Sequence, residues 1–344
     1  MSKSLIVIDG AQGEGGGQVL RTSLALALIT GKPFRLRNIR ARRSRPGLQA
    51  QHLMSVRAAA EIGAAKLRGA SLGSVDLTFE PGQVTAGDYH FKIGTAGATS
   101  LVLHTIYLPL ALSGGASTVI IEGGTHVKAS PCFHFLARTW TAYLKAIGIN
   151  GDVTLQRVGF YPRGGGAITA RIEPCECPLP FFGLTAAPIT TASIVTVLAG
   201  LPSQIGDRLR QRAANRLGNL GLEVETRMET HTGGPGCILG IELPTAPAPT
   251  FLFALGEKGT PAEAVADEAA SIVADFLRAD PLGVDEHSAD HLLLPLSLAE
   301  GASEFRVASL SSHLLTNADV IGHFLERSIT FEGTQGEPGT VRFG

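Results

Sequence analysis

The sequence has few cysteines, little net charge and no long apolar run, and each shortage excludes a class of protein. Four cysteines in 344 residues are too few for a disulfide-stapled scaffold of this length. The most apolar long segment, residues 101–112, is interrupted by His104 and Thr105 and is too short to span a bilayer. Lys and Arg number 29 against 30 Asp and Glu, so any site for a polyanion is a local one.

The N-terminal residues, MSKSLIVIDG, do not resemble a signal peptide because they contain only a short apolar run. We therefore expect a soluble cytoplasmic protein with reduced thiols, no membrane association and no disulfide-linked partner. Cys175 and Cys177 are not followed by a second pair, so a zinc site is not expected. Glycine is abundant, with 42 residues or about 12% against a usual ~7%, which predicts many tight turns.

A faint internal repeat organises the chain. Each copy consists of an apolar helix, a glycine turn, a strand, a second helix and a second strand. We expect the copies at residues 22–80, 100–158 and 289–332, with second helices that begin at Pro46 and Pro131 in the first two copies. This alternation of helix and strand favours an α/β class with layered sheets.

The spacing of the copies predicts an inserted domain. The glycine turns Gly31 and Gly115 are 84 residues apart, whereas Gly115 and Gly301 are 186 apart, an excess of 102 residues. We therefore expect three repeated α/β units that form a large catalytic domain, residues 1–183 and 280–344. A small α/β domain, residues 184–279, is expected to be inserted before the third unit.

The first strand-to-helix junction is strongly basic. Residues 31–57 contain eight Lys or Arg side chains and no acid, and the run ends where a helix is predicted to begin. Helix N-termini and arginine forks both suit phosphate oxygens, which favours phosphate binding over a merely solvated face. The second junction, residues 123–128, is interpreted on its own as an ordinary loop.

The third junction contains His313, just after two serines that can each cap a helix. The positive end of a helix disfavours imidazolium, so a neutral ring is expected there. A neutral imidazole beside a phosphate site can act as a nucleophile. The alternative is an ordinary capping or surface histidine.

Two glycine-rich stretches have no standard nucleotide-binding pattern. Residues 9–18 lack the lysine of a Walker A loop and the last glycine of the dinucleotide fingerprint. Glu14 is the acid among these glycines and could hold Mg²⁺ near a polyphosphate, and Arg21 follows shortly after. Residues 159–166 are interpreted as a structural turn. The sequence has no Lys-x-Asp-Gly, so a lysine nucleophile is not indicated.

Seven motifs in order resemble the RNA 3′-terminal phosphate cyclase family, from Ile6 to about Glu332. They are DGAQGEGGGQVLRTSLALA (9–27), IRARRSRPGLQAQH (39–52), GTAGATSLVL (94–103), GGTH (123–126), GFYPRGGG (159–166), ADHLLLP (289–295) and SSHLLTN (311–317). The family is described as three related α/β units with a small inserted domain, in agreement with the repeat and the insert.

The resemblance implies ATP-dependent conversion of an RNA 3′-phosphate to a 2′,3′-cyclic phosphodiester, with ATP and an RNA 3′-phosphate end as the substrates. His313 matches the family's nucleophile, which carries AMP as a phosphoramidate before AMP passes to the RNA. Glu14 matches an acid linked to Mg²⁺ or Mn²⁺. The residues that match those around the phosphates are Arg21, Arg42, Arg43 and Gln51.

Three positions near the expected adenosine depart from the family. Glutamine, tyrosine and glutamine are usual there, and this chain has His104, His287 and His291. Pro131 and Asp290 are retained and are expected to contact adenine and ribose. Because an imidazole can still stack or hydrogen-bond, we expect adenine binding with altered strength or selectivity.

Two other functions remain as alternatives. The first is a non-catalytic relative that binds RNA in ribosome assembly, although His313, Glu14 and the arginines argue against it. The second is an enolpyruvyl-transferase-like enzyme, which rests on repeated α/β units alone.

Overall fold

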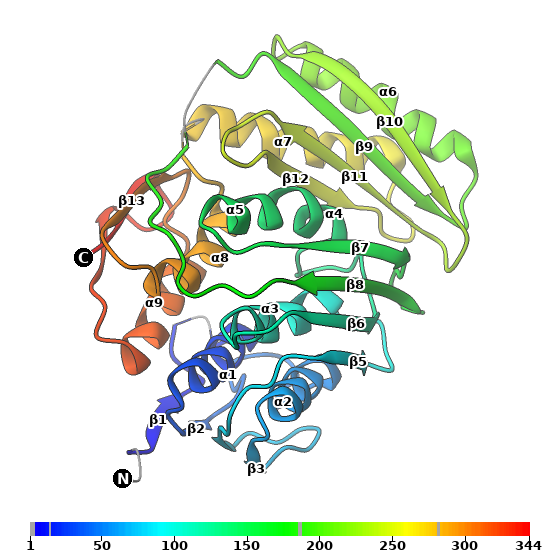
Figure 1. The fold of residues 1–344 in the computed structure, drawn as a ribbon. Coiled ribbons are helices and arrows are strands. Elements are labelled where there is room, and N and C mark those ends of the chain that lie inside the picture. Colours follow the sequence, from blue (N-terminus) through cyan, green and yellow to red (C-terminus); the bar gives the residue numbers. More distant parts are fainter. Residues whose placement is uncertain (1–3, 14, 185–187, 281–282) are drawn as a thin grey trace.

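Four small sheets, with helices packed on and between them, make up the part of the chain that the computed structural model describes, residues 4–13, 15–184, 188–280 and 283–344. The protein is α/β, and Figure 1 shows the four sheets with their helices. No helix of the described residues combines the length and the apolar composition that crossing a membrane requires.

The first sheet has the strand order β1-β2-β4-β3. β1 and β2 are parallel, and the other pairs are antiparallel. Its strands are β1 (Ile6–Asp9), β2 (Phe34–Arg37), β3 (Lys66–Arg68) and β4 (Leu77–Glu80). Helix α1 (Gly17–Thr30) connects β1 to β2, and α2 (Ala50–Ile62) connects β2 to β3.

The second sheet has the order β5-β6-β8-β7, again with one parallel pair, β5 and β6. Its strands are β5 (Asp88–Lys92), β6 (Ser117–Gly123), β7 (Gly151–Arg157) and β8 (Gly166–Ile172). Helix α3 (Thr99–Ala111) connects β5 to β6. Between β6 and β7 the chain forms α4 (Phe133–Phe135), a π-helical turn at Leu136–Trp140 and α5 (Thr141–Ala146).

The third sheet is antiparallel, with the order β13-β15-β14. Its strands are β13 (Ser303–Val307), β14 (Ile329–Gly333) and β15 (Gly339–Phe343). Val284 adds a parallel bridge to Val307 at the edge. Helix α8 (Glu286–Ser297) precedes β13, and α9 (Ser312–Phe324) follows it.

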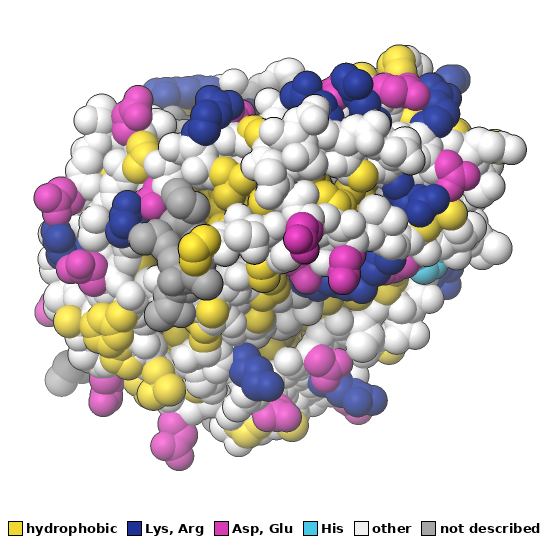
Figure 2. Space-filling view, turned by 90° about the horizontal axis from the view of Figure 1, so that it is seen from above, with side chains coloured by type: hydrophobic (Ala, Val, Ile, Leu, Met, Phe, Trp, Pro, Cys, Tyr) yellow, Lys and Arg dark blue, Asp and Glu magenta, His cyan; other side chains and the backbone are white. Residues whose placement is uncertain are grey.

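The fourth sheet has the order β10-β9-β11-β12 and its own two helices, which pack against it. Its elements are β9 (Thr191–Ala199), α6 (Ser203–Gly218), β10 (Glu223–His231), β11 (Gly236–Leu243), β12 (Thr250–Leu255) and α7 (Ala262–Ala279). Most of its buried apolar side chains form a cluster separate from the main core. Figure 2 shows Lys and Arg side chains beside Asp and Glu on the face seen from above. Between α6 and α7, Arg208 pairs with Glu263 and Arg212 with Asp267.

Helices α1 and α3 lie in the interior of the molecule. Ten of the 14 residues of α1 and most of α3 are buried, which is typical of a helix surrounded by protein on all sides. α1 contacts α2, α3 and α9, and α8 contacts α9. Polar residues on α1 are therefore held inside the protein, where they need polar partners from neighbouring helices.

The structure corrects several predicted boundaries. Helix α2 begins at Ala50 instead of Pro46, and residues 131–147 form three successive helical segments instead of one regular helix. Strands β3, β5, β8 and β15 were not predicted. β3 has only three residues, and β5 is largely exposed, so neither carries a strong apolar pattern.

Phe34 connects the first sheet to α9 and provides a test of this packing. Its ring is fully buried, stacks on Phe79 at 5.7 Å and meets Phe324 edge-on at 6.1 Å. Phe34→Ala is expected to lower the free energy of unfolding by about 3–5 kcal/mol, because it leaves a cavity between strand and helix. Urea titration measures this. Phe182→Ala, at a side chain that is 73% exposed, should change stability by no more than about 0.5 kcal/mol, and an equal loss in both variants would contradict the assignment.

Candidate functional site

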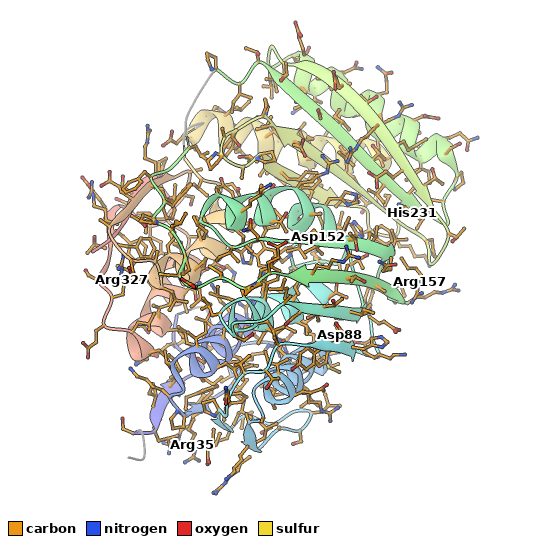
Figure 3. All side chains as sticks on the ribbon, viewed as in Figure 1. Arg35, Asp88, Asp152, Arg157, His231 and Arg327 are labelled. Carbon is orange, nitrogen blue, oxygen red and sulfur yellow. The ribbon has the colours of Figure 1, made fainter. Side chains whose placement is uncertain are left out.

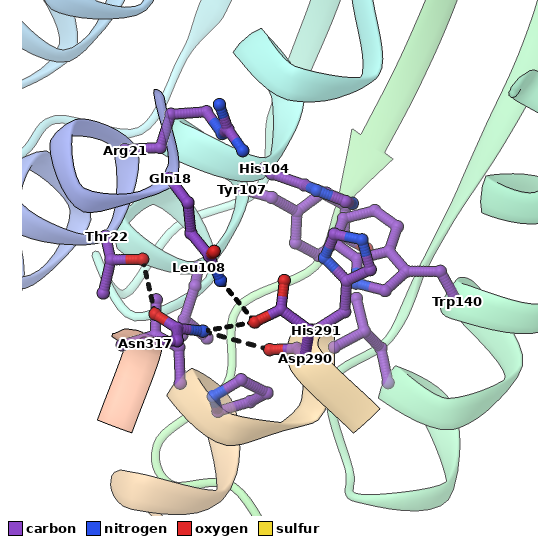
Figure 4. A pocket seen from close by; sticks show the side chains of 13 residues that line it. Gln18, Arg21, Thr22, His104, Tyr107, Leu108, Trp140, Asp290, His291 and Asn317 are labelled. Atoms are coloured by element: carbon purple, nitrogen blue, oxygen red, sulfur yellow. Dashed lines mark hydrogen bonds between the residues drawn. The ribbon is translucent and has the colours of Figure 1, made fainter. Parts of the chain in front are cut away.

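Three helices from distant parts of the chain, α1, α8 and α9, meet at one pocket together with α3 and the segment before α5 (Figure 4). One side of the pocket is polar and the other is aromatic and apolar. The lining residues are Gln18, Arg21, Thr22, His104, Tyr107, Leu108, Trp140, Leu144, Asp290, His291, Leu294, Pro295 and Asn317.

A chain of hydrogen bonds connects the polar side of the pocket to His313. His313 Nδ1 lies 2.7 Å from Gln18 Oε1, and Gln18 Nε2 donates to Asp290 Oδ1. Asn317 Nδ2 donates to the same carboxylate oxygen at 3.0 Å. Thr22 donates to Asn317 Oδ1 at 2.7 Å, which completes the chain. Figure 4 shows the part of this network inside the pocket.

This network determines which nitrogen of His313 carries the proton in the neutral ring. Because the amide of Gln18 donates to Asp290, its oxygen faces His313 and can only accept. Nδ1 of His313 is therefore the donor, and Nε2 carries the lone pair. His313 itself is exposed, in the first turn of α9, where Ser311 caps the helix by accepting from Leu314 N at 3.1 Å. The predicted serine cap is confirmed.

The aromatic side of the pocket contains two imidazoles and an indole. The His104 ring lies 4.0 Å from the His291 ring and 4.5 Å from Trp140, measured between centroids. Burial lowers the pKa of His104 to about 3, with a further contribution from Arg21, and burial lowers the pKa of His291 well below its usual value. Both rings are therefore neutral at physiological pH. No described residue forms a hydrogen bond with the buried His104 Nε2, so this nitrogen can accept from or donate to a bound ligand.

Arg21 and Asp290 are the charged groups of the pocket. Burial lowers the pKa of Arg21 to about 10, while Asp290 opposes this shift, so the guanidinium stays charged. Burial raises the pKa of Asp290, which His313 and Arg21 partly offset. A cation held at the edge of a dry pocket suits an anionic group of a ligand.

The predicted phosphate-binding residues lie beside the pocket on a neighbouring surface. Arg42 and Arg43 are exposed, with Arg42 Nη1 directed at Gly13 O over 3.5 Å and Arg43 against Gly16. The glycine-rich loop is in turn close to α9, since a Cβ on Gly13 would lie 2.1 Å from Thr316 Oγ1. Gln51 is also outside the pocket lining, and its Oε1 accepts from Ala98 N at 3.0 Å.

The remaining predicted residues are only partly placed. His287 is exposed, one helical turn before His291, and Pro131 is half-buried just before α4; neither lines the pocket. Glu14 falls outside the described residues. Among the described residues, no three His, Cys, Asp or Glu side chains come close enough to hold a metal ion. The four cysteines are free thiols.

Sequence reasoning missed the residues that orient His313. Gln18, Thr22 and Asn317 received no role, and neither did Trp140. A usable signal was present, because Gln18 and Thr22 are polar residues one turn apart on a helix that is mostly apolar and buried. Buried polar groups on such a helix require partners, which predicts a polar contact with another helix.

The fold and the site together define an α/β protein in which a neutral aromatic pocket adjoins a histidine oriented through an amide and a carboxylate. Residues 12–331 match the family model of the RNA 3′-terminal phosphate cyclase. A protein of Koribacter versatilis with that name is 44% identical over 334 residues, which cover 97% of this chain and 93% of the relative. A Ralstonia nicotianae protein with the same name is 42% identical over 328 residues, 95% and 93% of the two chains. The chain belongs to the RNA 3′-terminal phosphate cyclase family.

The depressed pKa of His104 predicts a specific acid sensitivity. The unfolded chain takes up a proton on His104 below pH 6.5, whereas the folded protein does not until about pH 3. This part of the stability is therefore fully present above pH 6.5 and is lost as the pH falls from 6.5 towards 3. His104→Gln should reduce the slope of the unfolding free energy against pH by up to about 1.4 kcal/mol per pH unit between pH 4 and 5.5.

Urea titrations at a series of pH values measure this slope. His323→Gln, which removes an exposed imidazole from α9, is the matched control and should leave the slope as in the original protein. Equal slopes in the original protein and His104→Gln would show that His104 is not kept neutral by burial.

Proposed function

We propose that the protein converts the 3′-terminal phosphate of RNA to a 2′,3′-cyclic phosphodiester at the expense of ATP, through a covalent histidine–AMP intermediate. The single observation that carries this proposal is the orientation of His313, whose Nδ1 donates to Gln18 so that Nε2 holds the lone pair. Family membership supports the substrate class, since the relatives are named for the RNA 3′-terminal phosphate.

In the first step, Nε2 of His313 attacks the α-phosphorus of ATP. The bond from the α-phosphorus to the bridging oxygen of the β-phosphate breaks, and pyrophosphate leaves. The ring becomes positively charged while its Nδ1–H stays hydrogen-bonded to Gln18. Asp290, on the far side of the Gln18 amide, stabilises that charge through the polarised amide, much as a buried carboxylate supports a catalytic imidazole.

In the second step, an oxygen of the RNA 3′-phosphate attacks the α-phosphorus of the histidine–AMP. The bond to Nε2 breaks, and the imidazole leaves as a neutral ring that keeps its Nδ1–H. The oxygen of the neighbouring 2′-hydroxyl then attacks the activated 3′-phosphorus, its proton passes to solvent, AMP leaves, and the cyclic phosphodiester forms. The steps depend on positioning and on charge neutralisation, which we assign to Arg42 and Arg43 beside the glycine-rich loop and to Arg21 in the pocket lining.

The neutral pocket of His104, His291 and Trp140 is proposed to hold the adenine ring. His104 Nε2, which has no hydrogen-bond partner among the described residues and lies beside the tilted Trp140 ring, supports base binding there, with strength or selectivity that differs from relatives that have other residues at these positions. Asp290 is more than a ribose contact in this scheme because its carboxylate holds Gln18. His287 and Pro131 stay predicted contacts to the nucleoside, and Gln51 stays a predicted contact near the phosphates.

The divalent cation belongs to this proposal as well. Glu14 is proposed as a ligand of Mg²⁺ or Mn²⁺ on the strength of the resemblance alone. A carboxylate with substrate phosphates is a usual ligand set for Mg²⁺, which would neutralise phosphate charge. The cytoplasmic location likewise stays a prediction.

We propose the same domain plan as the sequence predicts, with three related units in residues 1–183 and 280–344 and an insert at 184–279. The shared order of the first two sheets supports related units, and the Val284–Val307 bridge extends the likeness to the third. The separate buried cluster around α6 and α7 supports the insert as a domain.

Intact-protein mass after incubation with ATP and Mg²⁺ tests the first step. The original protein should gain one AMP, His313→Ala should gain none, and Gln18→Ala should form the adduct about a hundredfold more slowly. His323→Ala, on the same helix but exposed at its other end, is the matched control and should form the adduct at the original rate. If ATP binds but no adduct forms in the original protein, the nucleotidyl-transfer mechanism is wrong and a non-catalytic RNA-binding function is favoured.

A further inference from the structure

The loop between β7 and β8, residues 159–166, has features that its interpretation as a structural turn does not explain. Tyr161 at its tip is 77% exposed, more than any other large hydrophobic or aromatic side chain among the described residues. Arg157 and Arg163, on either side of Tyr161, are also exposed. A single exposed aromatic side chain needs no ligand to explain it. An exposed aromatic between two exposed arginines, however, is the combination with which proteins bind single-stranded nucleic acid.

Buried contacts anchor the loop to the protein interior. Phe160 is buried and stacks on His126 with a centroid distance of 5.2 Å. His126 contacts Thr125 Oγ1 at 2.8 Å and His134 Nδ1 at 2.9 Å, and Thr125 Oγ1 also accepts from Gly159 N at 2.9 Å. A buried side chain thus anchors the residue next to an exposed one, which presents the Tyr161 ring at little entropic cost to a ligand.

Contacts connect this loop to the proposed site. A Cβ on Gly164 would lie 2.8 Å from Ala96 Cα, so the loop packs on the segment that precedes α3. That segment is bound to Gln51 through Ala98 N, and His104 lies on the second turn of α3. Residues 96–98 therefore contact both α2, through Gln51, and the loop that contains Tyr161.

The opposite side of the loop meets the fourth sheet. Arg163 packs against Gly234 and Phe160 against Gly236, in the turn between β10 and β11 and at the start of β11. Figure 3 shows Arg157 and His231 towards the same end of the molecule, in keeping with these contacts. The loop thus lies where the fourth sheet joins the rest of the protein.

We propose that this loop binds the single-stranded RNA that precedes the terminal phosphate, with a base stacked on Tyr161 and backbone phosphates at Arg157 and Arg163. Single-stranded nucleic acid is bound by aromatic platforms beside cations, because every base has a face that can stack. The proposal rests on the proposed function, in which the RNA 3′-phosphate reacts with the AMP carried by His313. The proposal gives the RNA a second contact with the protein, several nucleotides before its reacting 3′ end.

The charged helices of the fourth sheet offer a contrasting surface. Arg208 and Arg212 on α6 are each held by a carboxylate of α7 at 2.6–2.8 Å. Because carboxylates neutralise these arginines, the outer face of α6 and α7 is expected to bind the RNA backbone weakly. It provides a control surface for charge variants.

Two substrates separate the loop from the reacting end, namely a decanucleotide and a dinucleotide that each end in a 3′-phosphate. Tyr161→Ala should raise KM for the decanucleotide about tenfold and change KM for the dinucleotide by less than twofold, because only the longer chain reaches the loop. Tyr161→Phe, which keeps the stacking face, should behave as the original protein. Phe182→Ala removes an aromatic of similar exposure elsewhere and should have no effect.

Charge variants and direct binding provide an independent measurement. Fluorescence anisotropy of a labelled decanucleotide 3′-phosphate should show a weaker salt dependence of binding for Arg163→Ala than for the original protein, by about one unit of slope. Arg208→Ala is the matched control and should retain the original slope.

Several results would overturn the proposal. They are an unchanged KM of Tyr161→Ala for the decanucleotide, an equal loss with both substrates, or an equal salt slope for Arg163→Ala and Arg208→Ala. Formation of the AMP adduct from ATP alone, measured for every variant, shows that the variant is folded and competent. If the original protein forms no adduct and no cyclic product, the proposed function fails, whereas anisotropy still tests the RNA contact.

Discussion

The amide of Gln18 is the contact on which the rest of the site depends. It lies on a buried helix, accepts from His313 on α9 and donates to Asp290 on α8. A side-chain amide accepts through its oxygen and donates through its nitrogen. Donation to Asp290 therefore determines that the oxygen faces His313, although His313 and Asp290 do not touch. The same Asp290 oxygen also accepts from Asn317, one helical turn after His313, so α8 and α9 are locked in one relative position. The placement of His313 and its tautomer thus follow from one set of hydrogen bonds.

The apolar core makes that network effective. α1 is surrounded by α2, α3 and α9, so Gln18 and Thr22 have little access to water, and their hydrogen bonds meet little competition from it. The same low polarity keeps the imidazoles of His104 and His291 neutral. The two sides of the pocket therefore differ in the ligand groups that they suit. The aromatic and apolar side suits a planar base, and the polar side, with Arg21, suits charged phosphate.

Sequence patterns predicted the parts of the fold that local rules determine. The helices α1 and α3 are long apolar runs that end near glycine turns, α9 begins at a serine cap, and the strands β2 and β6 are short apolar or alternating segments; all five were predicted. β15 pairs with β13 and with β14, which directly precedes it, but it was not recognised as a strand because it is short, begins with glycine and buries only two of its side chains. The π-helical turn at Leu136–Trp140 also has no local signal, since proline and glycine are both absent from it.

The site shows the same division between local and long-range information. A helix N-terminus with serines before His313 is visible in a sequence, and so is a basic run that contains Arg42 and Arg43. The partnership of Gln18 with His313 is not visible, because the two residues are 295 positions apart and meet only when α1 and α9 pack together. A polar residue on a buried helix is thus the best indication that a sequence gives of such a contact, and its partner has to come from the fold.

The fourth sheet packs on the rest of the protein through apolar side chains such as Phe251, and a buried polar contact lies among them. His126 and His134 are buried and hydrogen-bonded in series, and His134 Nε2 reaches Glu229 on β10 at 3.1 Å. The carboxylate fixes the direction of the series, because Glu229 can only accept when it is ionised. A directional hydrogen bond favours one orientation of the fourth sheet relative to the rest of the protein, whereas apolar contacts alone would permit several orientations. The loop that contains Tyr161 lies at this contact, so the same hydrogen bonds fix the position of the loop relative to α3.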